Sequence, residues 1–286
     1  MASARYCVIT GASRGLGRFL AEHFWRNGWN LILVARDRQA LDGFAHSLSG
    51  QTGQVLHVIV ADLADAAAIG QLIAEAKATF PRIDLLINNA GVQGPVGPSW
   101  KNDWQEWIAA LQVDLLAPVL LCRGIVPWML ETHGGSIINL SGGGATGPRA
   151  NFSSYATSKA GLVRFSETLA EELRPYGIRV NCVAPGAMDT DMLREVIAQG
   201  EEAVGKKEFE TAMRVVKDGG ASRQRVAELC AFLGSDDASG ISGKLISAPW
   251  DNWENWLEHV DELRASDAYT LRRITGRDRG FSWGDK

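Results

Sequence analysis

The sequence predicts an α/β protein with a doubly wound, mostly seven-stranded parallel sheet that carries helices on both faces within a single domain. Short runs of β-branched and apolar residues alternate with longer segments of helical pattern along the chain. Most strand candidates are continuously apolar, which is typical of parallel strands buried on both faces. The 286 residues contain no Pro/Gly/Ser-rich linker and no internal repeat, which favours one large domain.

The elements are expected to follow one another as strand, helix, strand for most of the chain. The strand candidates are residues 6–10, 31–35, 55–60, 84–87, 136–140, 178–183 and 244–247. The helix candidates are residues 15–27, 38–48, 66–79, 104–130, 154–175 and 223–232. We therefore assign residues 1–250 to one dinucleotide-binding and catalytic domain.

Two segments depart from this alternation. Residues 192–220 are charged and helical and lie between the sixth and seventh strands. Because ligands bind beyond the carboxyl ends of parallel strands, this insertion could cover a substrate, the alternative being a solvated helical pair. Residues 251–286 form an extension that follows Trp250 and contains Trp253, Trp256 and Trp283. Its tryptophans could pack on their own domain, form a subunit interface or contact the substrate.

Composition and charge narrow the function. The net charge is −4 and no basic cluster is interleaved with aromatic residues, so nucleic-acid binding has little support. No apolar run approaches the roughly 20 residues that cross a bilayer, and no signal-peptide pattern opens the chain, so we expect a cytoplasmic protein without a membrane partner. The four cysteines lie far apart, and the histidines show no metal spacing, so reduced thiols and no metal are expected.

A glycine-rich loop provides the first chemical signal. Residues 10–17 read TGASRGLG and link the first strand to the first helix. Glycines allow a tight turn and a close approach of the backbone to a pyrophosphate, while the helix N-terminus offers free N–H groups to that anion. The candidate phosphate-binding residues are Gly11, Ser13, Arg14, Gly15, Leu16 and Gly17.

Three further motifs accompany this loop. They are NNAG at residues 88–91, YATSK at residues 155–159 and NCVAPG at residues 181–186. With the TGxxxGxG spacing, they make the chain resemble the short-chain dehydrogenase/reductase family from about residue 5 to residue 247. The resemblance implies a Rossmann-type fold and an oxidoreductase that uses a nicotinamide cofactor. It adds to the cofactor site Asp62, Leu63, Asn89, Ala90, Gly91, Tyr155, Lys159, Pro185, Gly186 and Thr190.

The end of the second strand bears on which cofactor is used. Members of the family that bind NAD usually carry an acidic residue here, which accepts a hydrogen bond from the ribose. The corresponding position is Ala35, followed by Arg36, and Arg14 lies in the glycine loop. Two guanidiniums suit a 2′-phosphate, so NADP(H) is favoured over NAD(H). Asp37 keeps NAD(H) open, because a shift of one residue would let it reach a ribose.

Tyr155 and Lys159 are the central catalytic candidates. They stand four residues apart, so on a helix they share one face. A neighbouring ammonium favours the phenolate and lowers the pKa of a tyrosine. Tyr155 can then exchange a proton with a carbonyl or alcohol oxygen while hydride moves at carbon. In the family this lysine also holds the nicotinamide ribose.

The sequence departs from the family pattern at two catalytic positions. Where the family usually has a serine, 13 residues before the tyrosine, this chain has Gly142. Ser141 is one residue early and on an extended segment points to the opposite face, although the following glycines could reposition it. Thr146 and Ser153 are further candidate donors. Asp114 replaces the usual asparagine; it could pair with Lys159 and weaken the activation of Tyr155, or be a neighbour without effect.

The leading function is therefore an NADP(H)-dependent oxidoreductase that interconverts a ketone and a secondary alcohol with Tyr155 as acid and base. A cofactor-binding sensor without redox turnover is the alternative suggested by Gly142 and Asp114. A lyase or epimerase on the same scaffold is a third reading. The expected partner is a small carbonyl or alcohol substrate. Family members pair through long helices, here residues 104–130 and 154–175, so a homodimer or homotetramer is expected.

Overall fold

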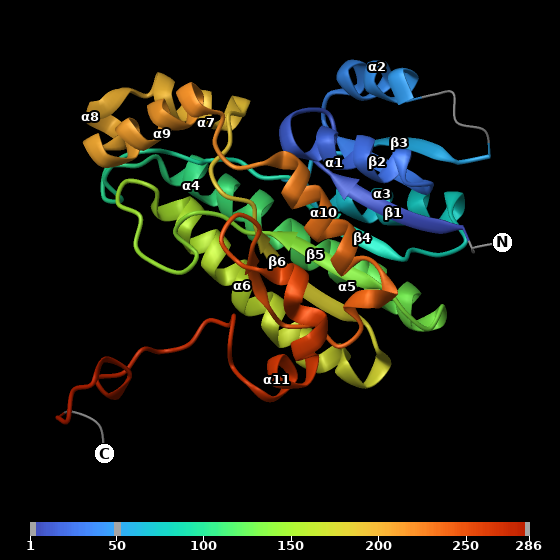
Figure 1. The fold of residues 1–286 in the computed structure, drawn as a ribbon. Helices are drawn as coiled ribbons and strands as arrows, with labels where there is room; N and C mark the ends of the chain where they lie inside the picture. Colours follow the sequence, from blue (N-terminus) through green and yellow to red (C-terminus); the bar gives the residue numbers. More distant parts are fainter. Residues whose placement is uncertain (1–3, 49–52, 284–286) are drawn as a thin grey trace.

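The structure is a computed structural model that describes residues 4–48 and 53–283. A seven-stranded sheet with the order β3-β2-β1-β4-β5-β6-β7 forms its centre, and every pairing in it is parallel (Figure 1). The strands are β1 (Arg5–Thr10), β2 (Trp29–Ala35), β3 (Leu56–Val60), β4 (Leu85–Asn88), β5 (Ser136–Leu140), β6 (Arg179–Ala184) and β7 (Leu245–Ser247). The predicted doubly wound sheet is confirmed.

The strand ends differ from the predicted ones by one or two residues. The largest shift is in β2, which begins at Trp29, because Trp29 pairs with Arg5 of β1. The side chain of Asn30 donates to the carbonyl of Arg5 at 3.1 Å and accepts from the amide of Val55 at 2.7 Å. A polar residue therefore lengthens β2 by forming hydrogen bonds to the chain segments on both sides of it. The hydropathy pattern does not reveal this role.

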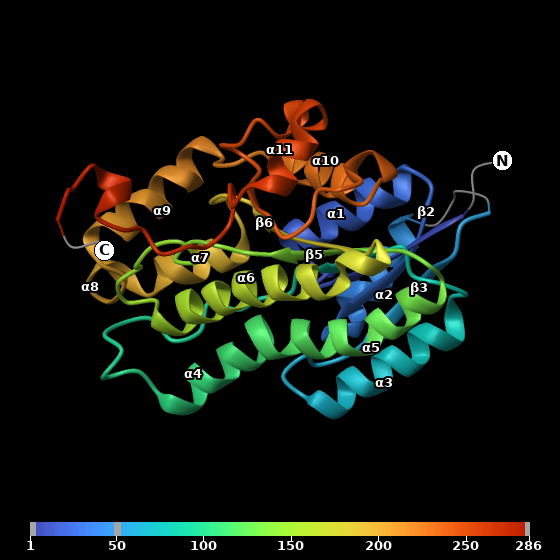
Figure 2. The same cartoon turned by 90° about the horizontal axis from the view of Figure 1, so that it is seen from below.

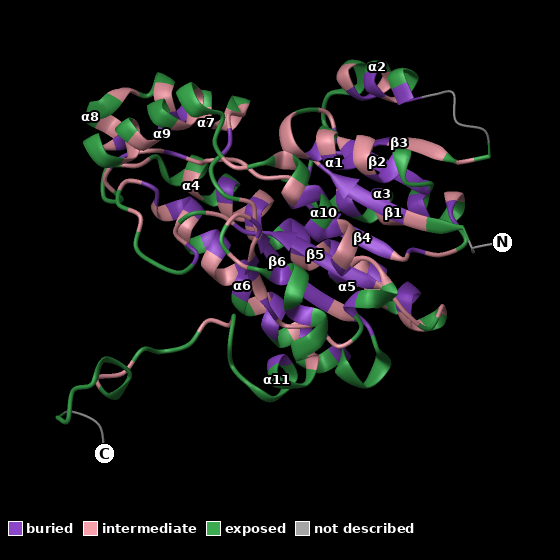
Figure 3. Cartoon of the chain, viewed as in Figure 1, coloured by how far each residue is buried: buried purple, intermediate pink, exposed green. Residues whose placement is uncertain are grey.

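Two layers of helices cover the sheet (Figure 2). One face is covered by α1 (Gly15–Arg26), α2 (Arg38–Leu48) and α10 (Arg223–Leu233). The other face is covered by α3 (Ala66–Thr79), α5 (Ala117–Glu131) and α6 (Ser153–Leu173). Each layer buries its own apolar cluster against the strands, and the buried residues follow the sheet through the molecule (Figure 3). The carboxyl ends of the strands are left open between the layers.

The helix predicted over residues 104–130 is not uniform. It consists of α4 (Trp104–Leu111), a π-helical turn (Gln112–Leu116) and α5, which begins with a proline in its first turn. Together, residues 104–131 are long and apolar enough to cross a membrane by length and composition alone, with a mean hydropathy of 1.7 over an 18-residue window. The expectation of no such segment was wrong here, although α5 packs against α3 in the helical layer as a core helix does.

The insertion between β6 and β7 is a compact helical unit. It contains α7 (Asp191–Ala198), α8 (Gly200–Val204) and α9 (Lys206–Asp218). An antiparallel bridge between Met188 and Gly220 closes its base. Val196 and Val204 are buried against Phe152, which lies just before α6. Because the insertion shares this small core with the start of α6, it is held against the catalytic end of the sheet and is more than a solvated pair of helices.

The extension after residue 250 begins as part of the core. Trp253 and Trp256 lie in a 3₁₀ helix (Trp253–His259), and both are buried in the cluster that α1 and α10 form. Trp253 stacks on Phe232 with 5.6 Å between ring centroids, and Trp256 packs on Tyr269 at 4.4 Å. These two tryptophans therefore pack on their own domain. Helix α11 (Val260–Ala265) follows them and completes this segment.

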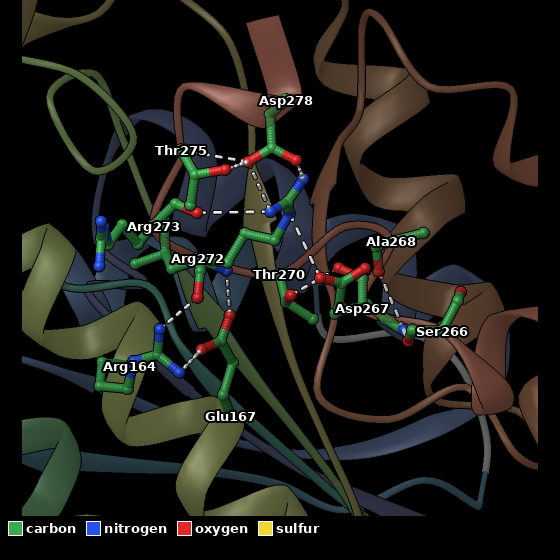
Figure 4. Close-up of polar contacts among 12 residues, drawn as sticks. Arg164, Glu167, Ser266, Asp267, Ala268, Thr270, Arg272, Arg273, Thr275 and Asp278 are labelled. Carbon is green, nitrogen blue, oxygen red and sulfur yellow. Dashed lines mark hydrogen bonds and ion pairs between the residues drawn. The ribbon is translucent and has the colours of Figure 1, made fainter. Parts of the chain in front are cut away.

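The residues after α11 cross helix α6 and then leave the body of the protein (Figures 1 and 4). Glu167 of α6 accepts a hydrogen bond from the amide of Leu271 at 2.6 Å, and Arg164 donates to the carbonyl of Leu271. Beyond this point Arg272 pairs with Asp278 at 2.9 Å. Polar contacts therefore tie the extension to α6 at one place, and the exposed Trp283 lies past it.

Replacing Trp253 with alanine tests whether the extension is part of the folding unit. Removing this buried ring leaves a cavity beside Phe232, so the free energy of unfolding should fall by about 3–5 kcal/mol. Trp283→Ala is the control, because that side chain is 73% exposed and should leave stability unchanged. Urea unfolding followed by circular dichroism measures both; equal stability of the two variants would contradict this assignment.

Candidate active site

A cleft of about 1050 Å³ opens at the carboxyl ends of the strands and runs from the end of β2 to the insertion. It is lined by the glycine loop, the ends of β3 and β4, the loop after β5, and α7. The predicted cofactor residues line it: Gly11, Ser13, Arg14, Gly15, Leu16, Gly17, Arg36, Asp62, Leu63, Asn89, Ala90, Gly91, Tyr155, Lys159, Pro185, Gly186 and Thr190. Ser141 also borders the cleft, whereas Asp114 lies behind its wall.

The glycine loop is packed so tightly that side chains are excluded at two positions. A Cβ atom on Gly17 would lie 2.2 Å from the carbonyl oxygen of Gly11. Gly11 has a φ of +67°, and a Cβ there would meet the backbone of Ala90 at 2.9 Å. No side chain caps the first turn of α1, whose preceding residue is Arg14. Its free N–H groups therefore face the cleft, and this cradle fits the pyrophosphate of a dinucleotide.

The junction between β1 and β4 rests on a residue that the site prediction left out. The hydroxyl of Thr10 accepts hydrogen bonds from the amides of Asn89 and Ala90, both at 3.0 Å. The side chain of Asn89 donates to the carbonyl of Thr10 at 2.9 Å. These contacts join the two strand ends at the place where the winding of the sheet reverses, which is where such sheets bind ligands. Thr10 was visible in the sequence only as the first residue of the glycine motif.

The end of β2 presents cations to the cleft. Ala35 has no side-chain acceptor for a ribose hydroxyl, and Arg36 follows it at the exposed rim. Asp37 accepts from the amide of Ala40 at 2.9 Å, so one of its oxygens is occupied at the start of α2. Arg14 lies 3.4 Å from Asp191 and 3.3 Å from Glu195 of α7. The insertion therefore reaches the glycine loop as well as the catalytic end.

The residues after β6 form the opposite wall. Gly186 has a φ of +79°, and a Cβ there would meet Ala221 at 2.8 Å. Thr190 caps α7 by accepting from the amide of Leu193 at 3.4 Å. Thr190 also lies on the cleft wall, and its contact with the cofactor, which the resemblance implies, stays a prediction.

Tyr155 and Lys159 lie together in the first turns of α6. The Nζ atom of Lys159 is 5.5 Å from the centroid of the Tyr155 ring and donates to the carbonyl of Leu140, at the end of β5, at 3.1 Å. Both residues are buried, the tyrosine to 8% exposure. Within the described chain, no protein group hydrogen-bonds the Tyr155 hydroxyl, so its proton and lone pairs are available to a ligand in the cleft.

Burial changes the electrostatic expectation for this tyrosine. Loss of solvent raises the pKa of Tyr155 above its ordinary value, and the ammonium of Lys159 opposes this rise without cancelling it. Asp114 adds to the rise, and the guanidinium of Arg149 opposes it. The lowering predicted from Lys159 alone is therefore outweighed, and Tyr155 is held in its protonated form.

Gly142 lies directly against Tyr155. A Cβ atom at position 142 would be 2.2 Å from the hydroxyl oxygen of Tyr155 and 2.9 Å from Cζ of the ring. The tyrosine therefore occupies the space that any side chain at this position would need. A side chain at position 142 would therefore force the Tyr155 ring to shift, so the glycine is matched to this position of the tyrosine.

The three hydroxyls proposed as substitutes lie in different surroundings. The oxygen of Ser141 is buried and has no hydrogen-bond partner in the structure, and the amide of the same residue donates to Val183 at 2.8 Å. Burial of the oxygen argues against contact with a substrate, so Ser141 remains only a prediction. Thr146 is exposed on the loop, and Ser153 accepts from the indole of Trp107 at 3.1 Å.

Asp114 is fully buried in the π-helical turn between α4 and α5. One carboxyl oxygen accepts from the amide of Val92 at 2.8 Å, and the other has no partner. Burial raises the pKa of Asp114, and the charge of Lys159 opposes that rise. A Cβ on Gly91 would lie 3.2 Å from Asp114 and 3.5 Å from Nζ of Lys159, so the two groups approach each other across this glycine.

Several residues that line the cleft were not among the predicted site residues, and three of them carry large or charged side chains. Arg149 lies in the loop before α6 and pairs with Glu208 of α9 at 2.9 Å. Trp250 follows β7 and is 86% exposed at the cleft rim. No short motif contains these residues, because chain segments distant in sequence bring them together.

Comparison with known proteins agrees with this fold and site. The short chain dehydrogenase family profile matches residues 5–201. Human dehydrogenase/reductase SDR family member 4 is 31% identical over 246 residues, which cover 85% of each chain. The 3-oxoacyl-(acyl-carrier-protein) reductase of Escherichia coli is 31% identical over 242 residues, covering 85% of this chain and 94% of the relative.

Solved structures give the same result. L-sorbose reductase from Gluconobacter frateurii, complexed with NADPH and L-sorbose, superposes with a TM-score of 0.76 and 30% identity over 86% of this chain and 95% of that one. An NAD+-bound xylitol dehydrogenase has a TM-score of 0.76 and 26% identity over 85% and 96% of the two chains. The chain therefore belongs to the short-chain dehydrogenase family of oxidoreductases, as its motifs indicated.

Replacing Asp114 with asparagine should stabilise the protein at neutral pH. Because the folded state raises the pKa of Asp114, it holds the proton at pH values where the unfolded chain has lost it, and stability falls as the pH rises through that range. The variant, whose amide does not ionise, should therefore be more stable than the wild type at pH 7, and this gain should shrink in acid. Urea unfolding at several pH values measures it, with the exposed Glu106→Gln as control. An unchanged or lower stability at pH 7 would count against the assignment.

Proposed function

We propose that this protein is an NADP(H)-dependent oxidoreductase that interconverts a ketone and a secondary alcohol, with Tyr155 as the acid and base. The observation that carries the proposal is the Tyr155 hydroxyl, which faces the cofactor cleft beside Lys159 and has no partner among the described residues. A buried phenol next to an ammonium is suited to proton exchange with a substrate oxygen. The family membership supports an oxidoreductase of this kind.

The residues divide the work of ketone reduction. NADPH, when bound, supplies the hydride to the carbonyl carbon. Tyr155 donates its hydroxyl proton to the carbonyl oxygen as negative charge develops there, and the resulting phenolate is stabilised by Lys159. The hydrogen bond from Lys159 to Leu140 keeps the ammonium beside the ring. In alcohol oxidation the phenolate accepts the hydroxyl proton instead, so this direction gains from higher pH.

The phosphate end of the cleft supports NADP(H). Arg36 lines the cleft next to Ala35, where an NAD-binding site would present a carboxylate, and Arg14 lines the cleft from the glycine loop. Asp37 uses one oxygen to cap α2 and is thereby less available to a ribose. A structural neighbour, L-sorbose reductase, is complexed with NADPH. A second structural neighbour, xylitol dehydrogenase, is bound to NAD+, so the same fold also accommodates NAD.

An apolar surface supports the assembly that we propose, a homodimer or homotetramer. Trp104, Ile108 and Leu116 are exposed along α4 and the π turn, and Trp104 stacks on Trp107 with 5.6 Å between centroids. Apolar side chains grouped on one helix are more stable when a second protein surface covers them. A second copy of this chain is the partner that we assign to this face.

Tyr155→Phe should reduce the rate of NADPH-dependent ketone reduction by about 10²–10⁴-fold, because the variant keeps the ring and loses the proton donor. The measurement is NADPH oxidation, followed by absorbance, over a panel of aliphatic, aromatic and sugar ketones. Tyr176→Phe is the matched control, since Tyr176 is 59% exposed after α6. Tight NADPH binding by the wild type without turnover of any ketone would refute the proposed reaction and favour a cofactor-binding protein.

Arg36→Ala should weaken NADPH binding by about 10–100-fold, which is the effect of losing a charged hydrogen bond to the 2′-phosphate. NADH binding should not change, because NADH lacks that phosphate. Titration of each cofactor by intrinsic fluorescence compares the two. Arg38→Ala removes a neighbouring exposed arginine that pairs with Asp42, and it should leave both affinities as they are. Equal loss for NADPH and NADH would point to a structural role for Arg36.

A further inference from the structure

The reaction needs a second group on the substrate oxygen, and position 142 cannot supply it. The Tyr155 hydroxyl occupies the place of a side chain there, as the 2.2 Å separation from a Cβ at Gly142 shows. The hydroxyl of Ser141 is buried without a partner. A donor for the developing negative charge must therefore come from another part of the cleft wall, on the same side of the tyrosine.

Arg149 lies in that position. Its guanidinium is next to Gly143, where a Cβ would be 3.9 Å from both Nε and Nη1, one residue along from the contact between Gly142 and Tyr155. Its Cζ atom is 3.8 Å from the centroid of the Phe152 ring and 5.8 Å from that of Tyr155. The side chain is only 17% exposed, so the guanidinium belongs to the cleft wall and is not a mobile surface charge.

The insertion holds this guanidinium by one edge. Nε and Nη2 of Arg149 both donate to the same carboxyl oxygen of Glu208, at 3.1 and 2.9 Å. Glu208 comes from the first turn of α9. Because the guanidinium is planar, its third nitrogen, Nη1, lies outside this pair, and within the described residues it has no hydrogen-bond partner. One edge is anchored, and the other keeps donors for a ligand.

From this arrangement we infer that Arg149 contacts the substrate oxygen through Nη1 and supplies the charge stabilisation that the family takes from a serine, while Glu208 positions it. The inference rests on the proposed ketone–alcohol reaction. Lys159 Nζ and Arg149 Cζ then both lie near Tyr155, at 5.5 and 5.8 Å from the centroid of its ring. Arg149 would be a catalytic residue, and Glu208 a positioning residue whose helix completes the site.

Substitution of Arg149 tests the inference on the full-length protein. Arg149→Ala and Arg149→Gln should lower kcat for ketone reduction by about 10²–10³-fold, the usual effect of losing one such donor. The Kd for NADPH should not change, which shows that the fold and the cofactor site are intact. Arg149→Lys should recover part of the loss, because lysine restores a charged donor but lacks the planar, two-pronged donor geometry of the guanidinium. Added guanidinium ion should partly rescue the alanine variant and leave the wild type unaffected.

The positioning role has its own variants. Glu208→Gln should lower kcat by about tenfold through loss of the charged anchor, which is worth roughly 1.5 kcal/mol. Arg214→Gln removes an exposed arginine from the same helix and should match the wild type.

Full activity of Arg149→Gln, beside a wild type that reduces ketones, would overturn the inference and leave the proposed reaction standing. A wild type that reduces no ketone would overturn both. A loss in Arg149→Ala that is matched by weaker NADPH binding and resists guanidinium would assign Arg149 a structural role.

Discussion

The site depends on one hydroxyl that joins two strands. Thr10 accepts from the amides of Asn89 and Ala90, and so fixes the ends of β1 and β4 against each other. The strand order reverses direction between β1 and β4, so the segments that follow these two strands run to opposite faces of the sheet. The cleft opens between those segments. The glycine loop packs against the same junction, because Gly11 contacts Ala90. The hydrogen bonds of Thr10 thus hold the strand junction against which the phosphate-binding end of the cleft is packed.

Most of the fold could be predicted, because the parallel strands are buried on both faces and read as continuous apolar runs. The remaining differences come from polar or tertiary contacts. Asn30 extends β2 through bonds to both neighbouring strands. The π turn around Asp114 divides a helix that looks uniform in hydropathy, and the carboxyl group buried in this turn accepts a hydrogen bond from the amide of Val92. Neither contact has a periodic signature, so neither could be recognised before the fold was known.

The site residues divide in the same way, into those that local spacing predicts and those that tertiary contacts bring together. Residues of the glycine loop and the Tyr155–Lys159 pair follow from local spacing, and they lie together as their motifs predicted. The balance of charge around Tyr155 did not follow, because burial raises its pKa more than Lys159 lowers it. Arg149 and Glu208 are 59 residues apart and meet only when the insertion packs on the loop before α6. Spacing finds residues on one helix or loop, but pairs between distant segments need the three-dimensional structure.

The interpretation of the glycine at position 142 changes once these contacts are considered together. Taken alone it is a lost hydroxyl, which would suggest a weakened enzyme. In the structure it allows the Tyr155 hydroxyl to approach the backbone, while Arg149 lies beside the next residue and keeps one nitrogen free. The charges near the tyrosine come from α6, the π turn, the loop after β5 and α9. Because Glu208 of α9 holds Arg149 near Tyr155, the insertion contributes to the charged surroundings of this tyrosine and is part of the cleft wall.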